Sequence, residues 1–192
     1  MEERDIKDYF APINTLLIVL NIIIFVWIDT KYSTQNWEWL LECGALYEPY
    51  IVEGKQYYRF LTSMFLHSGI NHIANNVLML WFMGGLLEQT IGKLKYTFIY
   101  FGSGILAGIV SVGYNVLIGN NAISVGASGA IFGVVGALVC IVCVKKNREI
   151  KLTTRQMVAF VILSLFSGIA DKTVGNVAHF SGFIIGFLMA FC

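Results

Sequence analysis

Charged side chains are scarce in this sequence. Asp, Glu, Lys and Arg account for 13% of the 192 residues and hydrophobic residues for 57%, whereas about 25% charged residues is usual for soluble domains. This deficit argues against an ordinary soluble domain. The formal net charge of +1 says nothing about nucleic acid, and without a basic tract we expect no nucleic-acid partner.

Cysteine is also rare, and its spacing fits no metal site. It occurs at Cys43, Cys140, Cys143 and Cys192. Cys140 and Cys143 are three residues apart in an apolar segment, where small buried hydrophobic side chains are the better interpretation. We therefore expect no metal, no other cofactor and no disulfide framework.

What the sequence does have is apolar runs that are long enough to cross a bilayer and recur along its whole length. Six of them cover approximately residues 13–28, 70–87, 96–117, 128–144, 157–169 and 174–192. We predict an all-α membrane protein with six transmembrane helices in one compact bundle. The whole chain, 1–192, is then a single membrane domain that begins with a short cytoplasmic segment at about 1–12.

The distribution of Lys and Arg predicts the orientation of the bundle. If the N-terminus is inside, the inner segments hold nine of the 13 basic residues, and the outer segments hold Lys31, Lys55, Arg59 and Lys172. The positive-inside rule then places the N-terminus in the cytoplasm, and it accounts for the basic cluster at 145–155 without a ligand. Residues 1–8 mix acidic and basic side chains, which argues against a signal or transit peptide. We expect a plasma membrane of prokaryotic type.

The long segment between the first two runs, residues 29–69, is rich in aromatic side chains with scattered charges. Trp and Tyr gather at membrane–water interfaces. We expect this segment to lie partly in the outer leaflet, although an ordinary extramembrane loop is the alternative.

The stretch from Val125 to Gly133 places Ser128 among small residues at the start of the fourth run. A serine in the first turn of a helix lies near free backbone N–H groups and the positive end of the helix dipole. Such a position suits a serine nucleophile with an oxyanion site. The alternative is that the small residues only mediate helix packing.

Three polar residues share one level of the predicted bundle. His72, Ser128 and His179 lie near the starts of the second, fourth and sixth runs, which all cross from outside to inside. They therefore fall at a similar depth near the outer face, and polar groups within membrane helices are usually functional. The fourth run has 17 residues, slightly short for a core of ~30 Å, so we expect Ser128 below the membrane surface, under a water-accessible pocket.

Chemistry assigns roles to these residues. Gly182 and Gly186, below His179, form a Gly-x-x-x-Gly pattern that lets the sixth helix approach Gly129 and Gly133 of the fourth. We expect this approach to bring His179 to Ser128 as its general base.

His72 and Asn76 are four residues apart and share one helix face, from which both can donate to an oxyanion. Asn75 is close to that face and is a rival to Asn76. No carboxylate is placed to orient His179, because Asp171 is eight residues away and Glu88 lies at the inner end of its helix. A Ser–His dyad is therefore predicted. Phe132 is expected either to pack against the imidazole of His179 or to belong to the core.

These residues, taken in order, resemble the rhomboid family of intramembrane serine proteases. The resemblance covers about 58–186 and rests on Tyr58-Arg59-Phe60-Leu61-Thr62, Met64-Phe65-Leu66-His67, His72 with Asn76, Gly126-Ala127-Ser128-Gly129, and Ala178-His179 with Gly182 and Gly186. The family usually has Trp before the arginine, where this chain has Tyr58. We expect the protein to have neither the extra helix nor the soluble domain of some relatives.

The resemblance implies a six-helix rhomboid-like bundle that cleaves transmembrane protein substrates in the lipid bilayer. It implies Ser128 as nucleophile and His179 as general base, with the Ser128 N–H, His72 and Asn76 stabilising the oxyanion. The family pattern selects Asn76 over Asn75, and it implies a structural role for His67.

Two other functions compete with proteolysis. A catalytically inactive rhomboid-like protein that binds membrane proteins would lack the serine or the histidine, and both are present here. A small transporter or channel predicts internal repeats or paired broken helices, and the sequence has no such symmetry.

Overall fold

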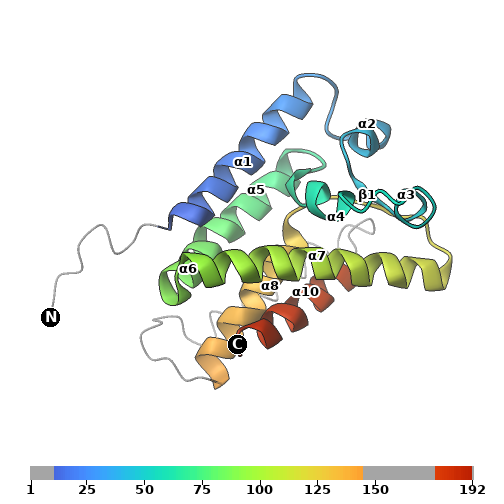
Figure 1. The fold of residues 1–192 in the computed structure, drawn as a ribbon. Helices are drawn as coiled ribbons and strands as arrows, with labels where there is room; N and C mark the ends of the chain where they lie inside the picture. The colour runs from blue at the N-terminus through green and yellow to red at the C-terminus, as the bar shows by residue number, and fades with distance from the viewer. Residues whose placement is uncertain (1–10, 145–175, 192) are drawn as a thin grey trace, which may run out of the picture.

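The computed structural model describes residues 11–144 and 176–191, which are mostly helical (Figure 1). In chain order the elements are α1 (Pro12–Asp29), α2 (Trp37–Glu42), β1 (Leu46–Tyr47), α3 (Glu48–Val52), α4 (Arg59–Thr62), the 3₁₀ turn η2 (Ser63–Phe65), α5 (Ile70–Met79), the π-helical turn η3 (Leu80–Gly84), α6 (Gly85–Ile91), α7 (Lys93–Ile118), β2 (Ile123–Ser124), α8 (Ser128–Val139), the π-helical turn η4 (Cys140–Val144) and α10 (Asn176–Met189).

The predicted membrane segments in the described part of the chain all fall on helices. α1 and α7 are long and apolar enough to cross a membrane on their own, and α8 with η4 and α10 are shorter apolar helices. The second predicted segment is one continuous path through α5, η3 and α6 and runs to Ile91, four residues beyond the predicted end. The fifth predicted segment, 157–169, and the basic cluster lie outside the described residues, so the six-helix bundle stays a prediction.

Helix α8 is the centre of the described bundle, packed between α7 and α10. Every residue from Ala130 to Leu138 is buried. Its contact with α10 is backbone against backbone, because a side chain at Gly186 would overlap the carbonyl of Gly133, and one at Gly136 would overlap the carbonyl of Phe183. The small residues predicted to bring these two helices together do so.

A buried polar network ties α1 to α6 and α7 at the far end of the bundle from Ser128. The Glu88 carboxylate, only 3% exposed, accepts hydrogen bonds from the backbone N–H groups of Ile13 (3.1 Å) and Asn14 (2.7 Å). Asn14 accepts from the Tyr96 hydroxyl (2.7 Å) and donates to the Leu80 carbonyl at the start of η3 (2.9 Å). Glu88 thus caps the first turn of α1, whose own N-cap, Ala11, makes no side-chain bond.

The segment between α1 and α5 folds into short helices held by a buried arginine. Arg59, 4% exposed, donates from Nη1 to the carbonyls of Leu41 and Ala45 at 2.8 Å each. Its guanidinium lies over the rings of Tyr50 (4.8 Å) and Tyr58 (5.5 Å). Tyr58 therefore provides the aromatic contact at the position where the resemblance leads one to expect Trp.

The prediction of a purely helical chain missed one short strand pair. Leu46 and Tyr47 of β1 pair antiparallel with Ser124 and Ile123 of β2. This pairing joins the long interhelical segment to the loop that leads into Ser128. A pair of two-residue strands leaves no alternating pattern that the sequence could reveal.

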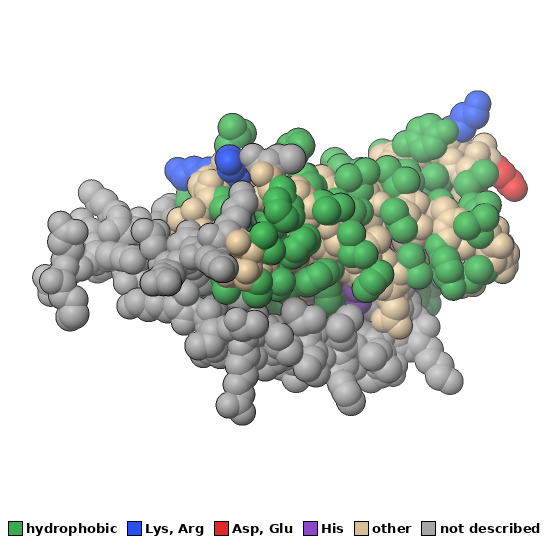
Figure 2. Space-filling model, turned by 90° about the horizontal axis from the view of Figure 1, so that it is seen from below, with side chains coloured by type: hydrophobic (Ala, Val, Ile, Leu, Met, Phe, Trp, Pro, Cys, Tyr) green, Lys and Arg blue, Asp and Glu red, His purple; other side chains and the backbone are tan. Residues whose placement is uncertain are grey.

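Among the described residues that Figure 2 shows, hydrophobic side chains dominate the surface, and the Lys, Arg and acidic side chains lie toward the two ends of this part. On α1 and α7 large apolar side chains are exposed, among them Ile23 (58%), Trp27 (56%) and Phe98 (68%). Monomeric soluble proteins rarely expose apolar surface on this scale. The distribution fits helices that face lipid.

Candidate active site

Ser128 is the first residue of α8, as predicted. The loop before it turns sharply at Gly126, which has φ of +120°, a conformation that residues with a Cβ rarely adopt. The Gly126 N–H donates to the Ser63 carbonyl at 2.9 Å, which fixes the loop against η2. The serine hydroxyl is thereby presented at a helix N-terminus on a firmly held loop.

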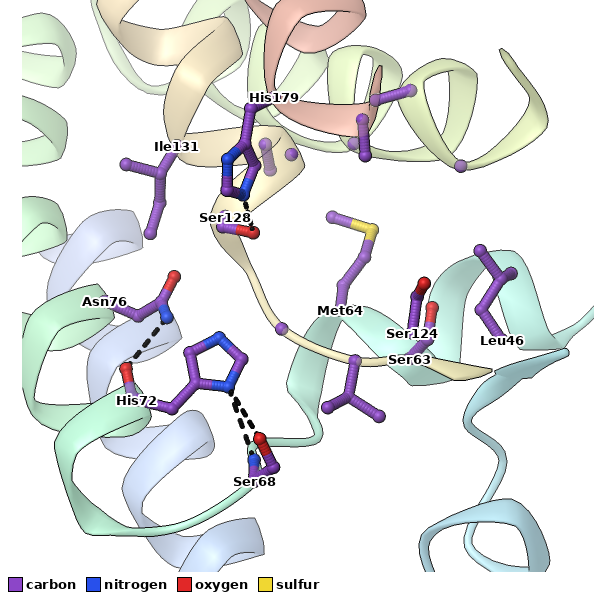
Figure 3. A pocket seen from close by; sticks show the side chains of 18 of the residues that line it. Leu46, Ser63, Met64, Ser68, His72, Asn76, Ser124, Ser128, Ile131 and His179 are labelled. Carbon is purple, nitrogen blue, oxygen red and sulfur yellow. Dashed lines mark hydrogen bonds between the residues drawn. The ribbon is translucent and has the colours of Figure 1, made fainter. Parts of the chain in front are cut away.

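The imidazole of His179 reaches Ser128 from the first turn of α10. Its Nε2 lies 2.8 Å from Ser128 Oγ, and the side chain is 4% exposed (Figure 3). The ring of Phe132, one turn below Ser128 on α8, stacks on the imidazole with centroids 4.4 Å apart and planes 17° apart. Of the two interpretations of Phe132, contact with the imidazole is confirmed.

No described residue hydrogen-bonds the other ring nitrogen of His179, Nδ1, which is buried. Of the two carboxylates considered from the sequence, Glu88 is engaged at the N-terminus of α1 instead, and Asp171 lies outside the described residues. Within the described residues the arrangement is therefore a pair of side chains without a third, orienting carboxylate.

His72 and Asn76 come from α5 on the opposite side of the same cavity (Figure 3). Asn76 is 6% exposed and its Nδ2 donates to the His72 carbonyl at 2.9 Å. Asn75 is exposed, although it also borders the cavity. Of the two asparagines, Asn76 is the one packed into the protein.

The imidazole of His72 lies over Gly126, two residues before the serine. A Cβ placed on Gly126 would come within 2.8 Å of His72 Nε2 and 2.9 Å of Cε1. Glycine is thus required at this position for close approach as well as for its φ. Ser128, His179, His72 and Asn76 all line one cavity of about 430 Å³.

Several residues of the site escaped the sequence analysis. The cavity wall includes Met64 of η2 and Gly104, Ala107 and Ser111 of α7. Nothing in the sequence pattern of the third apolar run, residues 96–117, indicates that its small residues border a site. Ser68, which contacts His72 Nδ1, precedes α5 in a loop whose path the sequence does not reveal. Within the described residues no group of three or more His, Cys, Asp or Glu side chains could hold a metal ion.

Comparison of the sequence with known proteins places the chain in a family of integral membrane proteins. A family model described as Rhomboid domain matches residues 54–192, and the chain therefore belongs to that family, which includes intramembrane serine proteases. Rhomboid protease GluP of Bacillus subtilis (strain 168) is 33% identical over 175 residues, which cover 91% of this chain and 33% of GluP. RHOMBOID-like protein 7 of Arabidopsis thaliana is 35% identical over 153 residues, 79% of this chain and 48% of that protein.

Another relative is Rhomboid protease GlpG of Photorhabdus laumondii, which is 29% identical over 186 residues, 94% of this chain and 61% of GlpG. The chain thus spans about a third of GluP and about half of the Arabidopsis protein. Similarity extends through the segments that carry the candidate site.

Proposed function

We propose that this protein is an intramembrane serine endopeptidase that cleaves transmembrane segments of membrane proteins with a Ser128–His179 dyad. The observation that carries the proposal is the 2.8 Å contact between Ser128 Oγ and His179 Nε2. A nucleophile and a base within about 2.6–3.2 Å of each other are the signature of covalent catalysis. Membership of a family with named proteases supports the same reaction.

In the proposed reaction Ser128 Oγ attacks the scissile carbonyl while His179 Nε2 takes the hydroxyl proton. His179 then gives this proton to the leaving amine, and the acyl-enzyme remains. A water molecule, deprotonated by His179, hydrolyses the ester and restores the serine. Because both steps pass a proton through Nε2, the imidazole must keep its orientation, and the stacked Phe132 ring restrains it.

The negative oxygen of each tetrahedral intermediate requires hydrogen-bond donors in a site shielded from bulk water. We assign this role to the backbone N–H of Ser128, to His72 and to the Asn76 amide. Their convergence on one cavity supports the assignment. The first-turn position of Ser128 leaves its N–H without a partner inside α8, so that this donor can serve the oxyanion.

The proposed setting is a plasma membrane with the N-terminus in the cytoplasm and one domain formed by the whole chain, 1–192. The site then lies near the outer face, at the starts of three helices that cross inward. Substrates are proposed to be proteins with a transmembrane helix, cut near its outer end.

The decisive test uses a serine-reactive fluorophosphonate probe and a cleavable membrane substrate on the purified protein in lipid. Ser128→Ala and His179→Ala should each abolish labelling and cleavage, because nucleophile and base act as one unit. Ser181→Ala is the matched control, since the Ser181 hydroxyl bonds the Val177 carbonyl within α10 at 2.7 Å, and it should behave as wild type.

Wild-type turnover by either dyad variant would show that the assignment is wrong. A wild-type protein that neither labels nor cleaves, yet retains membrane proteins in pull-downs, would favour the alternative of a catalytically inactive rhomboid-like binding protein.

A further inference from the structure

The loop before α5 makes two contacts with one nitrogen of His72. The backbone N–H of Ser68 points at Nδ1 over 3.4 Å, and the Ser68 hydroxyl lies 3.3 Å from the same atom (Figure 3). Both distances are at the long end for hydrogen bonds, as is common for catalytic contacts before a substrate is bound.

The chemical asymmetry of these two contacts is informative. A hydroxyl can donate or accept, but a backbone N–H can only donate. Nδ1 of His72 must therefore present its lone pair to Ser68. In a neutral imidazole the single ring proton then resides on Nε2.

Nε2 is the atom that faces the reaction site, because it is the part of the ring closest to Gly126 in the loop that leads into Ser128. We propose that Ser68 is a positioning residue that fixes His72 in the tautomer with the proton on Nε2, so that a neutral His72 donates to the oxyanion. This inference rests on the oxyanion role of His72 proposed above and adds the residue that sets its protonation.

A neighbouring histidine holds the ring in the same orientation. His67 is 1% exposed and packs against the His72 imidazole with ring centroids 5.1 Å apart and planes at 69°. Burial, and next the charge of His72, lower the pKa of His67 to about 3. His67 is thus a neutral ring that packs against His72 and hinders its rotation. In the proposal, the tautomer of His72 is determined by Ser68.

The direct test is nitrogen-15 NMR of the histidine-labelled full chain in lipid vesicles at neutral pH, with the His72 signals identified by their loss in His72→Gln. We expect an unprotonated Nδ1 and a protonated Nε2. A protonated Nδ1 overturns the proposal. The same spectrum recorded on Ser128→Ala reads the tautomer in a protein that cannot turn over, so failure of the proposed protease activity and failure of this inference are told apart.

Two substitutions test whether Ser68 is the cause. Ser68→Ala removes the hydroxyl but keeps the backbone donor, and the wild-type tautomer should persist. Ser68→Asp places a carboxylate acceptor beside Nδ1 and should draw a proton to that nitrogen. If Ser68→Ala already protonates Nδ1, the backbone of Ser68 does not control the tautomer. The Ser68→Asp spectrum provides the reference signal of a protonated Nδ1, against which the wild type and Ser68→Ala are compared.

Cleavage kinetics test independently which nitrogen of His72 donates to the oxyanion. A glutamine at position 72 places its amide nitrogen where Nε2 lies, and an asparagine places it where Nδ1 lies. His72→Gln should keep kcat within about tenfold of wild type, whereas His72→Asn should lose ~10²–10³-fold, the usual effect of a missing oxyanion donor. KM should change little in either variant. Equal losses in kcat, or a greater loss for glutamine, would contradict donation from Nε2.

Discussion

Adjacent asparagines on α5 show how the helix decides which side chain reaches the site. One residue along an α-helix turns the side chain by about 100°, since a turn holds 3.6 residues. Asn76 therefore faces the interior, 6% exposed, while Asn75 is exposed. Two chemically identical amides thus lie in different surroundings, and of the two asparagines Asn76 is the one packed beside His72.

We expect Asn76→Ala to reduce kcat more than Asn75→Ala. Asn76→Ala removes one oxyanion donor and should lower kcat by up to ~10²–10³-fold. The loss in kcat is smaller if the Ser128 N–H and His72 compensate for the missing donor. Steady-state cleavage of one membrane substrate by the two variants, made in parallel, provides the measurement and its control. A greater loss at Asn75 would place the wrong face of α5 in the site.

At the residue scale, the sequence predicts those contacts that follow from the level at which each helix starts and from regular helix geometry. Ser128 and His179 could be paired because their helices start at the same level and carry facing glycines. The choice between Asn75 and Asn76 needed the family pattern, because the phase of α5 depends on its neighbours. The contact of Ser68 with His72 could not be predicted, since it depends on the conformation of a loop.

The contact between α8 and α10 is the element-scale feature that brings the dyad together. Gly186 and Gly182 of α10 lie against the backbone of α8 at Gly133 and Gly129. In a membrane such close packing replaces the hydrophobic driving force that water would supply. The reach of His179 to Ser128 therefore depends on glycines one and two turns away from it.

Gly186→Ala should force the two helices apart and lower both stability and activity. Overpacking typically costs about 1–3 kcal/mol, and even a small displacement lengthens the dyad contact. Gly113→Ala in α7 is the control, because nothing lies within 4 Å of a Cβ at that position, and helix propensity favours Ala by about 0.5–1 kcal/mol. Thermal unfolding in detergent and cleavage rates should separate the two variants; a Gly186→Ala protein as stable and active as Gly113→Ala would refute the packing argument.

Helix α1 depends on a cap supplied by another helix. Glu88 accepts from the N–H groups of Ile13 and Asn14 and places a negative charge at the positive end of α1. The sequence predicts both helices but not this link, because the partners are 74 and 75 residues apart. The π-helical turn η3 is similarly hidden, since Asn14 binds the Leu80 carbonyl only in the folded chain.

Glu88→Ala should destabilise the protein by about 1–3 kcal/mol, because it leaves buried donors of α1 unsatisfied. Its effect on kcat should be small in comparison, as the dyad lies at the other end of the bundle. The exposed Glu53 provides the control, and Glu53→Ala should leave the unfolding temperature unchanged. Unfolding curves for the two variants measure the difference; equal curves would remove Glu88 as a cap.

At the scale of the whole molecule, the described residues form an apolar exterior around a cavity into which polar side chains project at the N-terminal ends of α5, α8 and α10. Lipid-facing helices allow a membrane protein to approach, and the cavity offers the polar surroundings that lipid lacks. A transmembrane helix cannot be cut as it stands, because its carbonyl groups are bonded within the helix. In the proposed reaction, the scissile segment of the substrate must therefore unwind before it can reach Ser128.

Substrate cleavage should therefore depend on how easily the target helix unwinds. Each polar group left unsatisfied in lipid costs ~2–7 kcal/mol. Gly or Pro in the target weakens the helix beforehand, and the cavity can satisfy the groups that are released. Ala127 and Gly129 beside the serine leave modest room, so a small residue such as Ala should precede the cut.

Mass spectrometry of products from a substrate series in reconstituted membranes measures the positions of the cuts and the cleavage rates. We expect cuts near the outer end of the span, after a small residue, and slower cleavage when the helix-weakening residues are replaced by Leu. Cuts in the inner third of the span, or rates indifferent to that replacement, would refute this account of substrate entry.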